Sequence, residues 1–139
     1  MHRVGHLRAA MDLLTPIRHT PGCGIDQGSS HIRGMVGPGL ADEVQECYRV
    51  FVNECLQRHC RRALILGRAN VDAFNHLALR DALRAMSVAG LPAGFRIALV
   101  AETPDLIAVY DAAVVEATRC GIDARRFQAA ADAERWLES

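Results

Sequence analysis

Apolar residues along the chain form two patterns, short continuous runs and longer stripes with helical spacing. The clearest run is residues 95–101, Phe-Arg-Ile-Ala-Leu-Val-Ala, with turn and cap residues on both sides. A run this short and this apolar predicts a strand that is buried on both faces of a sheet. Residues 63–67, Ala-Leu-Ile-Leu-Gly, repeat the pattern. We therefore expect two such strands in the interior of the fold.

Apolar stripes with spacings of three and four residues lie between these runs and predict amphipathic helices. The best-defined stripe begins at Leu40 and keeps its apolar residues on one helix face. A later helix has Thr103 as a potential N-cap, Pro104 at its first position and Gly121 as its stop signal. Two further helices are expected, one between the two runs and one over residues 129–138.

Three shorter segments complete the predicted strands. Residues 12–20 contain Pro16, which cannot donate to a ladder, so this strand should lie at an edge of the sheet. Residues 31–36 predict a second strand, and residues 122–127 predict a last one. Residues 21–24, Pro-Gly-Cys-Gly, are interpreted as a turn, and residues 28–30, Gly-Ser-Ser, are another loop signal.

The predicted order of elements is β, β, α, β, α, β, α, β, α. Alternation after the second strand implies parallel strands joined by right-handed helical crossovers. We therefore expect an α/β fold, with a mixed and mostly parallel sheet of four or five strands flanked by four helices. Residues 11–139 would form a single domain. Residues 1–10, which are basic and contain no acid, are expected to be a flexible tail.

Composition limits the classes of function. The 139 residues include 16 Lys+Arg and 16 Asp+Glu, so the formal net charge is zero. Nucleic-acid binding needs a basic excess, so no nucleic-acid partner is expected, whereas a zero charge permits a homodimer. No apolar run is long enough to span a bilayer, and the basic N-terminus lacks an apolar signal core. These features predict a cytoplasmic protein without a transmembrane segment.

The five cysteines contain no Cys-x-x-Cys pair. In a reducing compartment they are most simply small buried hydrophobes. Cys55 and His59 stand four residues apart on a predicted helix face and could share a metal ion, but no second ligand pair has zinc-site spacing. Burial is therefore the favoured interpretation, and no metal or cofactor is expected.

Fold-level motifs recur in the last two thirds of the chain. They are the two central runs together with Tyr110, Gly121, Arg126-Phe127 and Trp136-Leu137. With the order of elements, they resemble the SpoIIAA-like fold that STAS domains share with the STAS/SEC14-like bacterial proteins. The resemblance covers roughly residues 30–139 and rests on packing signatures, which are specific for a fold rather than for a function.

The resemblance implies a regulatory or binding module. Members of this wider family are mostly non-enzymatic, and STAS domains bind proteins, nucleotides or other small ligands. The phospho-switch members carry Asp-Ser-Ser/Thr-Gly in the loop after the central strand, whereas residues 68–73 contain no Ser or Thr. We therefore expect a module without the serine switch that binds a protein partner or a small ligand. The SEC14-like likeness leaves open a carrier of an apolar small molecule or lipid.

Ligands of open α/β sheets bind beyond the carboxyl ends of the strands. Three helix-opening loops should gather there, and their free N–H groups can hold an anion. The candidate ligand- or partner-binding residues are Arg68, Asn70, Asp72, His76, Glu102 and Thr103. Asp72 and His76 stand four apart, which leaves open a small hydrolase or transferase with His76 as general base, although a surface pair is the commoner explanation. No nucleophile–base motif is present, so no catalytic residue is assigned.

Overall fold

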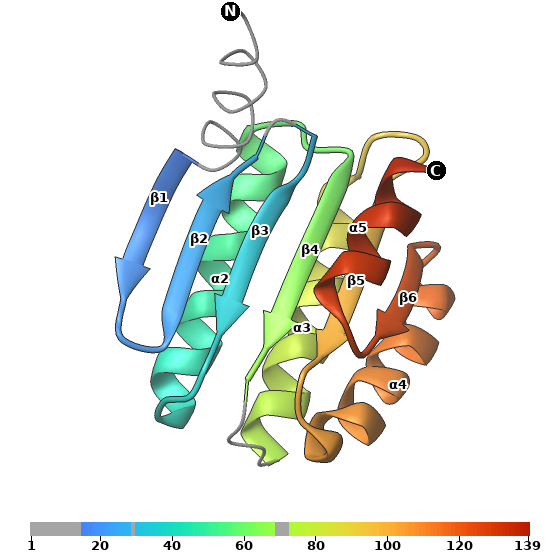
Figure 1. Ribbon diagram of the computed structural model, residues 1–139. Coiled ribbons are helices and arrows are strands. Elements are labelled where there is room, and N and C mark those ends of the chain that lie inside the picture. The colour runs from blue at the N-terminus through green and yellow to red at the C-terminus, as the bar shows by residue number, and fades with distance from the viewer. Residues whose placement is uncertain (1–14, 29, 69–72) are drawn as a thin grey trace, which may run out of the picture.

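A six-stranded mixed sheet organises the chain, of which the computed structural model describes residues 15–28, 30–68 and 73–139 (Figure 1). The strands are β1 (Thr15–Thr20), β2 (Cys23–Gln27), β3 (Ile32–Val36), β4 (Arg62–Gly67), β5 (Arg96–Ala101) and β6 (Asp123–Phe127). The helices are α2 (Ala41–Gln57), α3 (Ala73–Ala89), α4 (Pro104–Arg119) and α5 (Ala130–Glu138). The predicted α/β class is therefore confirmed.

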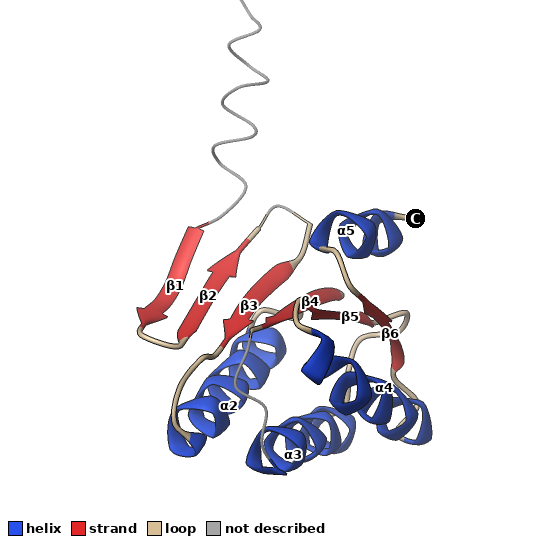
Figure 2. Ribbon diagram, turned by 60° about the horizontal axis from the view of Figure 1, so that its bottom comes forward, coloured by secondary structure: helices blue, strands red, loops and turns tan. Residues whose placement is uncertain are grey.

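The strands lie side by side in the order in which they occur along the chain. β2 is antiparallel to its neighbours β1 and β3, and β3 to β6 are parallel. Right-handed crossovers that all advance in one direction must place their helices on one face of the sheet. Figure 2 shows α2, α3 and α4 in a row on that face and α5 on the opposite face.

The prediction of four or five strands is wrong because β2 was not expected. The five-residue strand Cys23–Gln27 begins within the predicted turn and ends just before the predicted loop. Gly24 and Asp26 are poor strand formers and hide an alternation in which Cys23 and Ile25 are buried. The turn itself is Pro21-Gly22. β1 pairs only with β2, so the prediction of an edge strand with Pro16 in it is confirmed.

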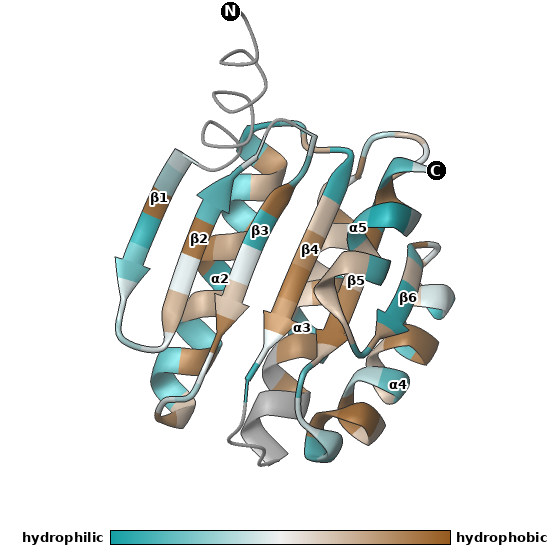
Figure 3. Cartoon of the chain, viewed as in Figure 1, coloured by the Kyte–Doolittle hydropathy of each residue, from teal (hydrophilic) through white to brown (hydrophobic). Residues whose placement is uncertain are grey.

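Two apolar cores cover the two faces of the sheet. The larger one lies under α2, α3 and α4 and includes Phe51, Leu83 and Leu99. The smaller one lies under α5 and includes Leu66 and Val100. Figure 3 shows β4 and β5 as strongly hydrophobic strands in the middle of the sheet. They bury alternate residues on both faces, as their continuous apolar runs predict.

Arginines from the sheet hold α5 in place. Arg62 Nε donates to the carbonyl oxygen of Leu137 at 2.7 Å, and Arg96 Nη1 donates to that of Trp136 at 2.8 Å. These are carbonyls of the last helical turn, which have no partner within the helix. The Arg96 and Arg125 guanidinium carbons also lie 5.1 and 5.3 Å from the centre of the Trp136 ring. The contacts of Arg96 with Trp136 explain why this charged residue stands in the apolar run of β5.

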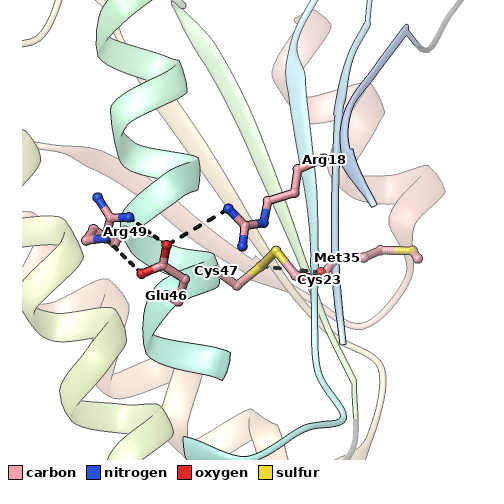
Figure 4. Close-up of a disulfide and its surroundings, with 6 residues drawn as sticks. All are labelled: Arg18, Cys23, Met35, Glu46, Cys47 and Arg49. Carbon is pink, nitrogen blue, oxygen red and sulfur yellow. Dashed lines mark hydrogen bonds and ion pairs between the residues drawn. A yellow bond between two sulfur atoms is a disulfide. The ribbon is translucent and has the colours of Figure 1, made fainter. Parts of the chain in front are cut away.

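A disulfide joins the β1–β2 hairpin to α2. Cys23, at the start of β2, is bonded to Cys47 in the middle of α2, and their Cα atoms are 5.6 Å apart (Figure 4). The interpretation of the cysteines as reduced buried hydrophobes is therefore wrong for this pair, whereas Cys55 is a free and buried thiol. The error follows from the missed strand, because only within β2 does Cys23 face α2.

Candidate functional site

The carboxyl ends of the parallel strands meet at one edge of the sheet. β3 ends before Gly37-Pro38, β4 ends before Arg68, and β5 ends before Glu102. Because β2 is antiparallel to both of its neighbours, the end of β1 and the start of β2 lie at this same edge. β6 also ends at this edge, because its last residue Phe127 pairs with Val100 near the end of β5. The edge thus receives groups from all six strands, of which β1 and β2 were not placed there by the sequence pattern.

The structure brings Arg68 and Glu102 together at this edge. Arg68 Nε lies 3.4 Å from Glu102 Oε1, and both side chains are exposed. Their backbone N–H groups continue the ladder beyond the strands, because Arg68 donates to Val36 and Glu102 donates to Gly67. An exposed ion pair of this kind contributes little to stability. The ion pair instead fixes the positions of the two side chains, so that a guanidinium and a carboxylate lie side by side at the edge.

Thr103 is the N-cap residue of α4, as predicted, but its hydroxyl makes no capping hydrogen bond. Thr103 Oγ1 is buried and has no hydrogen-bond partner among the described residues. The start of α4 therefore rests on Pro104, whose fixed φ suits the first turn, and on the negative charge of Asp105.

The remaining candidate residues of the sequence cannot be placed. Asn70 and Asp72 lie outside the described residues, and so does the side chain of His76, whose backbone belongs to α3. The proposed pairing of Asp72 with His76 stays a prediction, and with it the hydrolase or transferase alternative.

A pocket of about 330 Å³ opens at this edge, next to Arg68. We call it the rim pocket and define it by His19, Asp26, Met35, Pro38 and Arg68, which all line it. These residues come from β1, β2, β3 and the loops that follow β3 and β4. The rim pocket therefore lies on the β1–β4 side of the edge. Two of the three helix-opening loops that the sequence pattern indicates contribute to it, through Pro38 and Arg68, whereas the loop that begins at Glu102 does not line it.

A hydrogen-bonded His–Asp pair forms one wall of the rim pocket. His19 Nε2 lies 2.7 Å from Asp26 Oδ1, and the two side chains are 57% and 17% exposed. In the β1–β2 ladder His19 pairs with Gly24, which has no side chain to cover the pocket floor. A Cβ atom at Gly24 would lie 3.7 Å from Met35 Cβ and 3.9 Å from His19 Cδ2, which is ordinary contact.

Sequence reasoning missed His19 and Asp26 because their strand pairing was not predicted. The Pro21-Gly22 turn was the signal that could have revealed the hairpin, because a two-residue turn there pairs Thr20 with Cys23. His19 then pairs with Gly24, and Asp26 is two residues further along β2.

The rim pocket combines donors and acceptors. Arg68 and His19 can donate to an oxyanion, and Asp26 can accept from an amine or hydroxyl. Met35 adds an apolar wall. Convergent polar groups around a small hollow are the usual composition of a ligand site. The arrangement therefore suits a small polar ligand, or a polar side chain of a partner, better than an apolar one.

Two tyrosines pack beneath the same edge. The Tyr48 and Tyr110 hydroxyl oxygens lie 3.3 Å apart in the core, and burial raises both pKa values, that of Tyr110 to about 12. The Tyr110 hydroxyl occupies the space that a Cβ atom at Gly67 would need. This close approach explains why glycine ends β4. Gly67 and Tyr110 are two of the residues on which the resemblance to the SpoIIAA-like fold rests. The contact shows that both have a role in packing.

The proposed metal pair is not assembled. Cys55 is buried in α2, and burial raises the pKa of its thiol. His59 lies beyond the end of α2, is exposed, and has a φ of 51°. The two residues therefore do not share a helix face. Within the described residues there is no group of three or more His, Cys, Asp or Glu side chains that could hold a metal ion.

Comparison of the chain with protein-family models, with curated proteins and with solved structures finds no match. The resemblance to the SpoIIAA-like and STAS proteins thus rests on the sequence pattern alone and stays a prediction. No helix in the described part of the chain is long and apolar enough to cross a membrane. The predicted cytoplasmic location is weakened by the Cys23–Cys47 bond, because disulfides persist mainly in oxidising compartments.

Proposed function

We propose that this protein is a non-enzymatic binding module of the SpoIIAA/STAS type. Its contact surface is the rim pocket, and its ligand is a small polar molecule or a polar side chain of a partner protein. The observation that carries the proposal is the convergence of His19, Asp26 and Arg68, from three separate segments, on one hollow at the carboxyl edge of the sheet.

The position of the pocket supports a binding role. The carboxyl edge is where open α/β sheets place their ligands. The face of β1–β3 opposite α2 carries polar residues such as His19 and Asp26. A ligand there reaches His19, Asp26 and Arg68 without displacing the apolar core.

The loop after β4 offers no site for the phosphorylation switch of the family that the chain resembles. Residues 68–73 contain no hydroxyl side chain. In such a module, occupancy of the rim pocket takes the place of the phosphate as the signal. Arg68 is then the contact residue of that loop, and we expect its guanidinium to make binding depend on negative charge of the ligand.

The carrier alternative is less well supported by this site. A carrier of a lipid or another apolar molecule needs an enclosed, mainly apolar cavity. The rim pocket is bounded by an imidazole, a carboxylate and a guanidinium, and each would lose hydration against an apolar ligand.

Amide chemical-shift mapping tests the proposal. The ¹⁵N-labelled full chain is titrated with a fragment set that contains carboxylates, amines, zwitterions and neutral aromatic compounds. We expect fragments with polar groups to shift the amides of His19, Gly24, Asp26 and Arg68 selectively. The absence of any fragment that shifts these amides would overturn the proposal, and so would shifts confined to another surface.

A glycine substitution provides the matched variant. Gly24→Val places a side chain on the pocket floor, at a position whose φ is not left-handed and where a Cβ makes ordinary contacts. We expect it to abolish the fragment-induced shifts while the protein remains folded. Ala129→Val is the control, because Ala129 is exposed and its backbone is extended (φ −124°, ψ 136°), as valine prefers.

A further inference from the structure

A second surface, separate from the rim pocket, lies between the outer sides of α3 and α4. We propose that this groove binds an acidic, amphipathic helical segment of a partner protein. We call it the helix groove and define it by Arg80, Arg84, Val115, Glu116 and Arg119, which line it. Its volume is about 430 Å³.

The helix groove is cationic although the chain as a whole is neutral. Arg80, Arg84 and Arg119 face a single glutamate, Glu116, among its lining residues. Arg84 Nε lies 3.0 Å from Glu116 Oε2 and holds the pKa of that carboxyl below its ordinary value, and Arg119 adds to the effect. One carboxylate is therefore shared by two guanidinium groups, and positive charge is left over.

Arg80 adds an incompletely satisfied donor. Its Nη2 lies 3.4 Å from Asp81 Oδ1, which is a neighbouring residue on the helix surface. Its Nε is buried and has no hydrogen-bond partner among the described residues. A buried N–H without a partner is costly, and a carboxylate brought into the groove by a ligand would supply the acceptor.

Exposed apolar residues lie beside these arginines. Four large hydrophobic residues are exposed in the described part of the chain, and three of them lie on α3 and α4: Leu77, Val88 and Val115. Val88 is 88% exposed and Val115 is 54% exposed. On α3, spacings of three and four place Leu77 and Val88 on the same stripe as Arg80 and Arg84. The two arginines thus lie between the two apolar residues on this stripe, and Val115 adds an apolar position on α4.

The chemistry of this surface specifies its partner. An amphipathic helix places apolar side chains at i, i+3, i+4 and i+7, and can lay them into a groove between two helices. Glutamates that flank those positions would meet Arg80, Arg84 and Arg119. A second copy of the chain is a poorer occupant, because its acidic helix α5 buries its apolar residues Ala133 and Leu137 in its own core.

The test uses a synthetic helical peptide with Leu at i, i+3, i+4 and i+7 and Glu at most other positions. We expect it to shift amides of α3 and α4 in the ¹⁵N-labelled full chain, and to bind more weakly at high salt. A peptide with Lys in place of Glu should not bind. Equal binding of the Lys peptide, or shifts that lie elsewhere, would overturn the proposal.

Charge reversal within the groove sharpens the test. Arg119→Glu should weaken peptide binding by about tenfold or more, the size of effect usual for one interfacial charge. Arg61→Glu is the matched control, because Arg61 is exposed and lies outside the groove. If both variants bind as the unchanged protein does, the proposal is wrong.

Two further outcomes separate this proposal from its alternatives. Gly24→Val should leave peptide binding unchanged, because the rim pocket plays no part in it. Concentration-dependent self-association that Arg119→Glu abolishes, in the absence of peptide, would assign the helix groove to a second copy and overturn the choice of partner.

Discussion

The two halves of the sheet are stabilised in different ways. In the half formed by β4, β5 and β6, helices cover both faces, and the inner strands β4 and β5 are buried almost throughout. In the half formed by β1, β2 and β3, α2 covers one face, a disulfide fastens the hairpin, and the rim pocket opens at the edge. Most of the residues that are buried on both faces of the sheet lie in the first half. Most of the proposed ligand contacts lie in the second.

This difference separates residues that stabilise from residues that bind. Leu99 is fully buried and touches no pocket described above, whereas His19 and Arg68 are exposed and contribute little packing. Substitutions in the two halves should therefore affect different measurements. The predictions below test this separation, from the largest expected effect to the smallest.

Truncation in the buried half should have the largest effect on stability. Leu99→Ala removes a fully buried side chain from β5 and leaves a cavity. We expect the free energy of unfolding to fall by about 2–5 kcal/mol. Urea denaturation followed by circular dichroism measures this change. A loss well below that range would mean that the core around β5 is not closely packed.

Loss of the disulfide should destabilise the hairpin half. Cys23 and Cys47 are 24 residues apart in sequence, and closing a loop of that size stabilises a protein by about 3.5 kcal/mol in the chain-entropy model. We expect Cys23→Ala combined with Cys47→Ala to lower the free energy of unfolding by about 2–4 kcal/mol. Hydrogen exchange should show faster opening of β1 and β2 than of β5. Equal acceleration in both halves would contradict the separation.

Acid should weaken the seam between β3 and α5. His31 is buried, its Nε2 lies 3.9 Å from Glu134 Oε2, and burial lowers its pKa from 6.5. Glu134 and Glu138 oppose this shift, and Arg33 adds to it. The unfolded chain therefore takes up a proton at His31 at a higher pH than the folded protein does.

The sign of the pH dependence follows from this difference. Above about pH 6.5 the histidine is neutral in both states and its contribution does not change with pH. Below that pH the unfolded state binds the proton more readily, so the free energy of unfolding falls as the pH falls toward the lowered pKa. His31→Gln should remove this part of the dependence, as measured by urea denaturation between about pH 7.5 and about pH 5.5, one unit either side of the ordinary value. An unchanged pH profile in the variant would contradict the role of His31.

The smallest effect on the free energy of unfolding is expected for Arg68, at the edge of the sheet. Arg68→Ala breaks an exposed ion pair and should change the free energy of unfolding by no more than about 1 kcal/mol. The same variant should lose the fragment binding proposed for the rim pocket. Glu102→Ala is the matched control for the ion pair, because Glu102 does not line the pocket. Equal losses of binding in both variants would mean that the ion pair, rather than the Arg68 guanidinium, is what matters.

The buried half could be predicted from the sequence because its pattern is unambiguous. Residues 63–67 and 95–101 lie in strands covered on both faces, so almost every position is apolar, and only a strand fits so short a run. Pro104 and Gly121 mark the ends of α4 for local reasons, a fixed φ at one end and a φ of 77° at the other.

The hairpin half was harder to predict because its signals are not local. β2 contains Gly24 and Asp26, which disfavour a strand, and it forms because Ile25 is buried and Cys23 is bonded to Cys47. The His19–Asp26 pair depends on the register of β1 with β2, so it could not be found before β2 was known. Arg68 could be predicted as a binding residue because it directly follows β4, and the sequence marks the end of that strand with Gly67.

The central claim is that the binding site is the rim pocket, which the β1–β3 half of the sheet forms together with Arg68 at the end of β4. The most direct test is the affinity of the best-binding polar fragment for the unchanged chain, for Gly24→Val and for Ala129→Val, measured by chemical-shift titration together with the thermal midpoint of each protein. We predict that binding is lost in Gly24→Val alone, with no fall in its thermal midpoint. Undiminished affinity in a folded Gly24→Val protein would contradict the claim.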